Sequence, residues 1–165
     1  MEIRYTVEGD WAALRAIRLA SLQDAPRAFG LSYASAAAYP ESRWRDQAAG
    51  RARPRFLLAF EGERPVGMIG HAASAGPDLE LIGMWVAPEY RGQRVATLLV
   101  DAVKLHARSA GHPRVLLAVS PDNGRAAAFY QKQGFAFLPE WEPLDSDPSV
   151  TLQSMQWLAT TEHTA

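Results

Sequence analysis

Residues 81–100 read LIGMWVAPEYRGQRVATLLV, and this stretch decides the fold. It opens with an apolar segment ending at Val86, which is typical of a buried strand. A short connection over residues 87–90 follows, and from Arg94 the apolar residues recur at helical spacing. A helix that starts directly after a strand presents free N–H groups and the positive end of its dipole. The stretch therefore predicts a site for an anion such as a pyrophosphate.

The residue types at this helix start suit a phosphate ligand. Gly92 removes a Cβ where a phosphate must approach closely, and Ala96 is small. Arg91 and Arg94 add positive charge. The same pattern is also common in turns that bind nothing. Neither the Gly-Lys-Ser/Thr of ATPase phosphate loops nor the Gly-x-Gly-x-x-Gly of dinucleotide-binding domains is present.

A second informative segment is NGRAAAFYQKQGF, residues 123–135. Asn123 and Tyr130 are seven residues apart, so they lie on nearly the same face of a helix, roughly 10 Å apart along its axis. An amide and a phenol in this arrangement could contact the two ends of an extended ligand. Each also has a purely structural interpretation, Asn123 as a helix N-cap and Tyr130 as a half-buried core aromatic.

Working outward from these segments, strands and helices alternate in the second half of the chain, after hairpin strands in the first. This order predicts a mixed, mostly antiparallel central sheet flanked by helices, an α/β (α+β) fold forming one domain over residues 1–165. The predicted strands cover residues 3–7, 55–61, 65–73, 79–86, 114–120, 135–138 and 150–158. The predicted helices run from residue 10 to before residue 26 and over residues 41–49, 94–110 and 123–133.

Composition excludes several classes of protein. The formal net charge of −1 argues against a surface for nucleic acid or an anionic membrane. Cysteine is absent, which excludes disulfides and a thiol nucleophile. No apolar run is long enough to span a bilayer, and the N-terminal residues lack a signal-peptide core, so we expect a cytoplasmic protein. No histidine pair has metal spacing, and we expect no metal.

The two segments together resemble the GCN5-related N-acetyltransferase (GNAT) superfamily. Its signature, Arg/Gln-x-x-Gly-x-Gly/Ala at a helix start, corresponds to residues 91–96. A later Asn-x-x-Ala-x-x-x-Tyr-x-x-x-Gly-Phe helix corresponds to residues 123–135, with every position matched. The first motif departs at Arg94, where the superfamily has glycine. We expect Arg94 in the first turn of the helix, where a positive φ is not required.

The resemblance implies a GNAT fold and direct transfer of an acetyl group from acetyl-CoA to an amine, with no metal. Tyr130 would protonate the departing CoA thiolate and Glu80 would act as general base. Strand alternation places Glu80, Ile82 and Met84 on one face, although Glu80 also reads as a solvated residue near a strand start. The implied cosubstrate-binding residues are Met84, Trp85, Val86, Arg91, Gly92, Gln93, Arg94, Val95, Ala96 and Asn123.

The acceptor is an amine of a small molecule, peptide or protein, and the resemblance also suggests a homodimer. Antibiotics, polyamines, amino acids, peptide N-termini and protein lysines all stay open. An alternative from another class is a catalytically silent acyl-CoA-binding regulatory module. The superfamily builds its acceptor site from the first helices and late loops, which here contain Arg15, Arg18, Phe29, Tyr33, Trp44 and Trp141.

Overall fold

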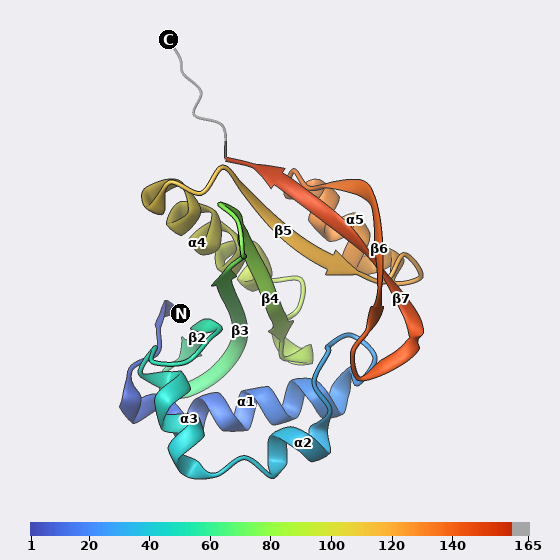
Figure 1. Ribbon diagram of the computed structural model, residues 1–165. Helices are drawn as coiled ribbons and strands as arrows, with labels where there is room; N and C mark the ends of the chain where they lie inside the picture. Colours follow the sequence, from blue (N-terminus) through green and yellow to red (C-terminus); the bar gives the residue numbers. More distant parts are fainter. Residues whose placement is uncertain (160–165) are drawn as a thin grey trace.

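The computed structural model describes residues 1–159 and has a seven-stranded sheet at its centre (Figure 1). The strands are β1 (Glu2–Tyr5), β2 (Arg55–Glu61), β3 (Arg64–Ala73), β4 (Leu79–Val86), β5 (Arg114–Val119), β6 (Ala136–Leu144) and β7 (Asp147–Leu158). Their order across the sheet is β1-β2-β3-β4-β5-β7-β6. In this part of the chain β4 and β5 pair in parallel, and the other neighbours pair antiparallel. The predicted mixed, mostly antiparallel α+β fold is confirmed.

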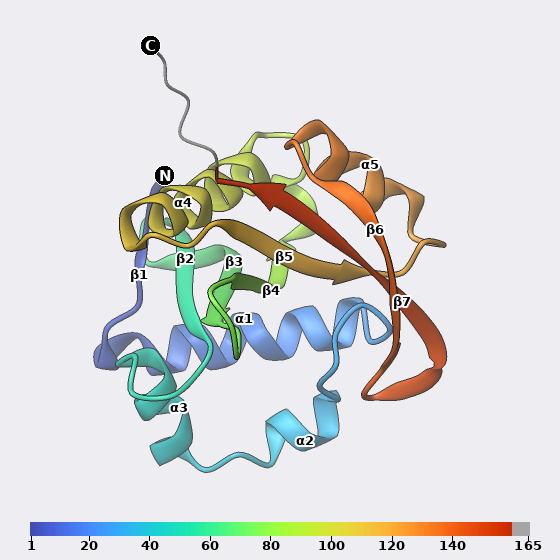
Figure 2. The ribbon, with the colours of Figure 1, turned by 45° about the horizontal axis from the view of Figure 1, so that its top comes forward.

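Helices cover both faces of the sheet (Figure 2). Each helical layer encloses an apolar core, with Leu14 and Trp44 in one and Leu99 and Tyr130 in the other. The first layer consists of α1 (Trp11–Asp24), α2 (Tyr33–Ala37) and α3 (Glu41–Ala48). The second layer consists of α4 (Val95–Ala110) and α5 (Gly124–Lys132). Two short 3₁₀ turns, η1 (Glu8–Asp10) and η2 (Pro88–Tyr90), precede α1 and α4.

β2 shows how one strand serves both cores. Its successive side chains point to opposite faces of the sheet, and those at residues 56–60 are all buried. Phe56 and Phe60 pack on the α1 side, whereas Leu57 packs on the α4 side. A strand buried on both faces reads as a continuous apolar run, and this is how RFLLAFE reads in the sequence.

β4 contains a bulge. Met68 of β3 pairs with Trp85 and Gly70 with Ile82, so β4 carries one more residue than β3 over this interval. Gly83 lies inside the bulge with φ 65°, a conformation that glycine adopts readily. The extra residue reverses the alternation of side chains along the strand.

The bulge corrects one expectation about the faces of β4. Leu81 before it and Met84 after it both pack in the α4-side core, whereas Trp85 packs in the α1-side core. Regular alternation would have placed Leu81 and Trp85 together. The expectation that Glu80, Ile82 and Met84 share one face is therefore wrong.

β4 and β5 separate soon after their pairing begins. The parallel pairing is confined to Leu79 with Val115 and Glu80 with Leu116. β4 continues beyond this point to Val86 and β5 to Val119. A gap in the hydrogen-bonded ladder therefore opens in the middle of the sheet.

The C-terminal hairpin is longer than the sequence predicts. β6 and β7 run to residue 144 and from residue 147, where strands over 135–138 and 150–158 were expected. Most side chains of residues 139–149 are exposed, so apolar residues do not alternate there. The short helix α2 was also not expected. None of the helices in the described chain is long and apolar enough to cross a membrane.

Candidate active site

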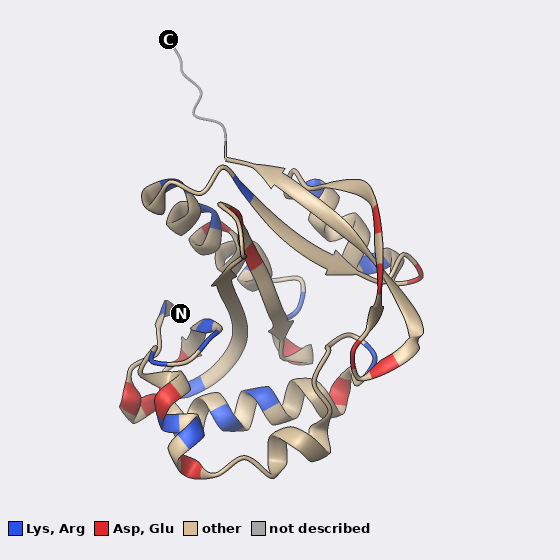
Figure 3. Ribbon diagram, in the orientation of Figure 1, with Lys and Arg blue, Asp and Glu red and all other residues tan. Residues whose placement is uncertain are grey.

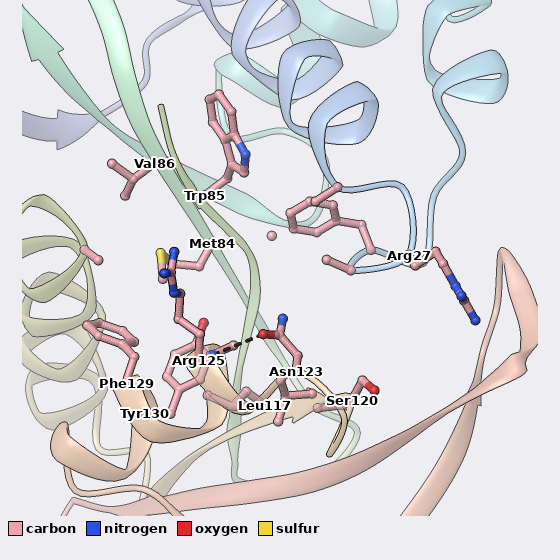
Figure 4. Close-up of a pocket in the computed structure, with 18 of the residues that line it drawn as sticks. Arg27, Met84, Trp85, Val86, Leu117, Ser120, Asn123, Arg125, Phe129 and Tyr130 are labelled. Carbon is pink, nitrogen blue, oxygen red and sulfur yellow. Dashed lines mark hydrogen bonds between the residues drawn. The ribbon is translucent and has the colours of Figure 1, made fainter. Parts of the chain in front are cut away.

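A cleft of about 1550 Å³ opens where β4 and β5 separate (Figure 4). One wall consists of the end of β4 and the start of α4, and the opposite wall of the end of β5 and α5. The loop after α1 and the β6–β7 hairpin contribute to the lining as well. The predicted site residues that the cleft brings together are Met84, Trp85, Val86, Arg91, Gly92, Arg94, Val95, Ala96, Asn123 and Tyr130.

The start of α4 presents backbone donors to this cleft. The helix begins at Val95, and Val95, Ala96 and Thr97 all line the cleft. The N–H groups of a first helical turn have no acceptor within the helix. At Gly92 φ is 80°, and a Cβ there would meet no atom within 4 Å. Space and donors for an anion therefore lie together, as the sequence predicts, whereas the Gln93 side chain bonds the Glu89 carbonyl outside the lining.

Arg94 corrects a second expectation. It is the N-cap of α4 and has φ 68°, in the left-handed region. The expectation that this position needs no positive φ is wrong, because Arg94 precedes the first helical residue and forms part of the turn into it. The superfamily has glycine at this position because glycine adopts a positive φ without strain.

Arg91 joins neighbouring elements through hydrogen bonds, in addition to carrying a positive charge. Its Nε donates to the Val86 carbonyl and its Nη2 to Asp24, both at 2.9 Å. The Trp85 indole donates to the same Asp24 oxygen at 2.9 Å. These two donors, Trp85 first and Arg91 second, lower the pKa of Asp24. The charge of Arg91 is therefore partly balanced, and replacing Arg91 would disturb the junction of α1, β4 and α4.

The backbone of β4 has a free edge along the gap. Ala87 donates its N–H to Val66 of β3 at 2.9 Å. Successive N–H groups of a strand point to opposite edges, so the Val86 N–H points away from β3. It faces the gap because the parallel pairing with β5 ends at Glu80.

Asn123 and Tyr130 lie on α5, on the other side of the gap (Figure 4). Asn123 is the N-cap, and its Oδ1 accepts from the Ala126 N–H at 3.2 Å. Its NH₂ group is left to donate elsewhere. Tyr130 is 7% exposed and its ring packs edge-on against Phe129 and Phe135. Burial raises the pKa of Tyr130, which keeps the phenol protonated at neutral pH.

Arg125 and Ser120 line the cleft although the sequence reading did not select them. Arg125 projects into the cleft from the first turn of α5 (Figure 4). A cation two residues after an N-cap, beside a motif that matches a CoA-binding helix, was the available signal. Elsewhere both signs of charge are interspersed around the fold (Figure 3).

Glu80 is not brought to the cleft. Its side chain is exposed and does not belong to the lining. Glu80 pairs with Leu116 where β4 and β5 are still joined, and the gap begins beyond that pair. Counting residues back along β4 placed Glu80 near the site, but neither the bulge nor the separation of the strands was visible in that count. The carboxylates that do line the cleft are Asp24 and Asp122.

Within residues 1–159 no group of three or more His, Asp or Glu side chains is arranged to hold a metal ion. Three of the histidines lie close together, on β3, on α4 and directly after α4. His71 stacks on His106 with ring centroids 4.2 Å apart, and His112 lies 6.1 Å from His106. None of the three belongs to the cleft lining.

The profile of the acetyltransferase (GNAT) family matches residues 15–135. This chain belongs to that family. The resemblance seen in the sequence is therefore confirmed, and its two motifs form the two walls of the cleft.

Curated relatives of this GNAT chain include IAA acetyltransferase of Azospirillum brasilense, 33% identical over 95 residues (57% of this chain, 62% of the relative). Human N-acetyltransferase 8 is 34% identical over 85 residues, which are 48% of this chain and 37% of the relative. The alignments thus span less than two thirds of either relative.

Solved structures share the fold at low identity. A GNAT acetyltransferase from Streptococcus pneumoniae superposes with a TM-score of 0.79 at 20% identity, covering 95% of this chain and 98% of its own. The structure of yncA from Salmonella typhimurium, solved with its cofactor acetyl-CoA, has a TM-score of 0.76 at 18% identity. The superposition covers 100% of this chain and 96% of yncA. These structural similarities agree with the mixed, seven-stranded sheet described above and with a GNAT fold.

The residues expected to form the acceptor site of this GNAT protein separate into three groups. Phe29 and Trp141 line the cleft. Trp44 is 1% exposed and belongs to the α1-side core, and Arg15 and Tyr33 lie outside the lining. Arg18 is buried next to the lining, beside Gly83 and Phe29.

Proposed function

We propose that this GNAT protein transfers the acetyl group of acetyl-CoA directly to an amine of a small molecule or peptide. The observation that carries the proposal is the cleft between β4 and β5, which combines a helix N-terminus, a free strand edge and a protonated phenol. Family membership supports an acyl-transfer reaction. The structure of yncA with acetyl-CoA supports the choice of cosubstrate.

The cleft fits acetyl-CoA by its donors and its space. The pyrophosphate would accept from the N–H groups of Val95 to Thr97, beside the cations of Arg94 and Arg125. The pantetheine arm carries amides, and it would take the place of the missing strand next to β4. The Val86 N–H and the NH₂ of Asn123 are donors available to it.

Bound acetyl-CoA would supply a thioester for the acceptor amine to attack. Within the segment Met84 to Val86, the backbone N–H groups that face the gap would stabilise the oxyanion that forms. Tyr130, kept neutral by burial, would donate its proton to the departing CoA thiolate. Because the chain contains no cysteine, we propose direct attack by the amine with no thioester-linked enzyme intermediate.

The acceptor amine must lose a proton before it attacks. Asp24 is committed to Trp85 and Arg91, and Glu80 lies outside the lining. We therefore assign no side chain as general base and propose that water takes the proton. An alkyl amine with a pKa of about 10 is mostly protonated at pH 7, so the rate should rise with pH until the amine is neutral.

The test is the release of free thiol from acetyl-CoA in the presence of a panel of amines, followed across pH. Release that depends on one class of amine supports the transferase. A protein that is stabilised by CoA in a thermal shift but releases no thiol with any amine is a silent acyl-CoA-binding module instead. The cytoplasmic location and the homodimer stay predictions from the sequence.

Replacing Tyr130 by Phe tests the proposed proton donor. The variant keeps the buried ring, so the fold and the affinity for CoA should change little. Turnover of the best amine should fall roughly tenfold to a thousandfold, because only the proton donor is lost. Tyr33→Phe, at an exposed tyrosine outside the cleft, is the matched control. Undiminished turnover of the Tyr130 variant, where chemistry limits the rate, would remove Tyr130 from the mechanism.

A further inference from the structure

Arg18 on α1 is a buried cation without a counter-ion in the described chain. Its side chain is 8% exposed, and Nη1 has no hydrogen-bond partner within residues 1–159. Burial lowers the pKa of Arg18 to about 10, so the group stays charged at neutral pH. Tyr39 and two aromatic rings offset part of the cost of burying this charge. Because Nη1 still has no acceptor, Arg18 has room for an anionic partner that arrives from outside the chain.

Aromatic rings and a glycine surround the guanidinium. Its carbon lies 5.7 Å from the centre of the Phe29 ring and 5.6 Å from that of Phe56. A Cβ added to Gly83 would lie 2.8 Å from Nη1. Gly83 and Phe29 both line the cleft. The charge therefore lies directly beside two parts of the cleft lining, the backbone at Gly83 and the ring of Phe29.

Asp24, the cleft carboxylate on the same helix as Arg18, is already occupied. Asp24 accepts from Trp85 and Arg91, which leaves it little capacity for a further cation. The Phe29 carbonyl accepts from the Ser146 hydroxyl at 2.8 Å, which holds this part of the loop against the β6–β7 hairpin. Access to Arg18 from the cleft therefore depends on the Phe29 side chain, which lies beside the guanidinium, and not on its backbone.

We propose that Arg18 binds a carboxylate of the acceptor, and that the acceptor is a free amino acid. This inference rests on the proposed acetyl transfer and names the substrate class of the same site. A planar guanidinium matches a carboxylate with two parallel hydrogen bonds, and one cation in an apolar surrounding balances one negative charge. Gly83 directly precedes Met84, at the start of the segment proposed to bind the acetyl group. The carboxylate must therefore lie close to the reacting amine, as it does in an α-amino acid.

The same charge argues against polycationic acceptors. Aminoglycosides and polyamines carry several ammonium groups, which a buried guanidinium repels. Receptors for such ligands need a surplus of carboxylates, and here Asp24 is committed and Asp122 is the other lining carboxylate. Of the classes left open by the sequence, the amino acid is the one that always carries a carboxylate next to the amine to be acetylated.

The experiment compares the standard L-amino acids with their carboxamides as acceptors, at equal concentrations of uncharged amine. The wild-type protein should show a higher kcat/KM for the acids. In Arg18→Met this value should fall roughly 10- to 100-fold for the acids and stay unchanged for the amides. Arg18→Lys should recover part of the loss. Arg43→Met, an exposed arginine outside the cleft, is the matched control and should behave as wild type.

A second readout separates this inference from the proposed function. With CoA present, N-acetyl amino acids should raise the melting temperature of the wild-type protein but not that of Arg18→Met, while calorimetry shows equal CoA affinity for both. If no thiol is released with any amine, acetyl transfer fails, and this binding difference still decides the role of Arg18. A wild-type protein that uses amides as well as acids overturns the inference without any variant. Equal stabilisation of both proteins by N-acetyl amino acids overturns it too.

Discussion

Arg94 carries backbone strain at the mouth of the cleft. It is the one non-glycine residue with positive φ in residues 1–159, and an L-residue in this region costs about 1–2 kcal/mol. The strain places a cation beside the free N–H groups of α4, where a phosphate would bind. Charge at this position is thus gained at the expense of stability.

We predict that Arg94→Gly raises the free energy of unfolding by about 1 kcal/mol, because glycine relieves the positive φ. Arg94→Ala removes the same charge but keeps a Cβ, so it should give no such gain. Both variants should bind CoA more weakly, and to a similar extent. Denaturant titration and calorimetry provide the two measurements. An alanine variant as stable as the glycine variant would show that φ is not the source of strain.

At this scale the sequence predicts residues that a helix face brings together. Asn123 and Tyr130 both line the cleft because a seven-residue spacing fixes their direction once α5 forms. The backbone conformation of Arg94 and the position of Glu80 relative to the cleft were wrongly predicted, because both depend on tertiary structure. One depends on the turn that joins η2 to α4, and the other on the point at which β4 leaves β5.

Among the elements, β4 determines the shape of the site through its bulge. Gly83 has φ 65° and lies against Arg18. The bulge needs its positive φ, and Arg18 needs the space that a side chain would fill. Gly62, in the β2–β3 turn, has φ 62° but open space around its Cα hydrogens. The two glycines thus share a backbone conformation and differ in packing.

Gly62→Ala should lower the free energy of unfolding by about 1 kcal/mol through φ alone. Gly83→Ala should lower it by at least about 1 kcal/mol more, because a Cβ must also displace the buried Arg18. Urea unfolding of both variants measures the difference. Equal losses would show that Arg18 yields at no cost and that its position is not fixed by packing.

Element boundaries were predictable where burial is strong. β4 was predicted at its observed bounds, and β2 lies within a continuous apolar run. The β6–β7 hairpin was predicted only in part, because Pro139, Pro143 and Pro148 and exposed side chains replace the alternating pattern. The bulge of β4 leaves no mark in the sequence beyond one glycine.

At the scale of the whole molecule, a histidine cluster couples stability to pH. His71 is buried, and its Nε2 lies 2.7 Å from the Tyr5 hydroxyl. Burial, followed by the charges of His106 and Arg55, lowers the pKa of His71 from 6.5 to about 4. As the pH falls below 6.5, the unfolded chain therefore takes up a proton that the folded protein does not.

We predict that stability is lost as the pH falls from 6.5 to about 4, in the window set by His71. His71→Phe keeps a ring against His106 but removes the titration, so its melting temperature should fall less over this window. Asp24 and His106 also have lowered pKa values and are present in both proteins, so the difference between the two curves reports the loss of the His71 titration. Parallel curves for variant and wild type would exclude this role.

The gap between β4 and β5 also has a consequence for the lifetime of the protein. It divides the sheet into two parts, β1–β4 and β5–β7–β6, that share two paired residues on each side. A ligand bound in the gap would contact both parts of the sheet. It would stabilise the folded arrangement of the two parts relative to opened forms by mass action. Proteases attack transiently opened forms. Degradation in a cell would therefore slow when acetyl-CoA is plentiful, and the supply of one metabolite would set how long this protein persists.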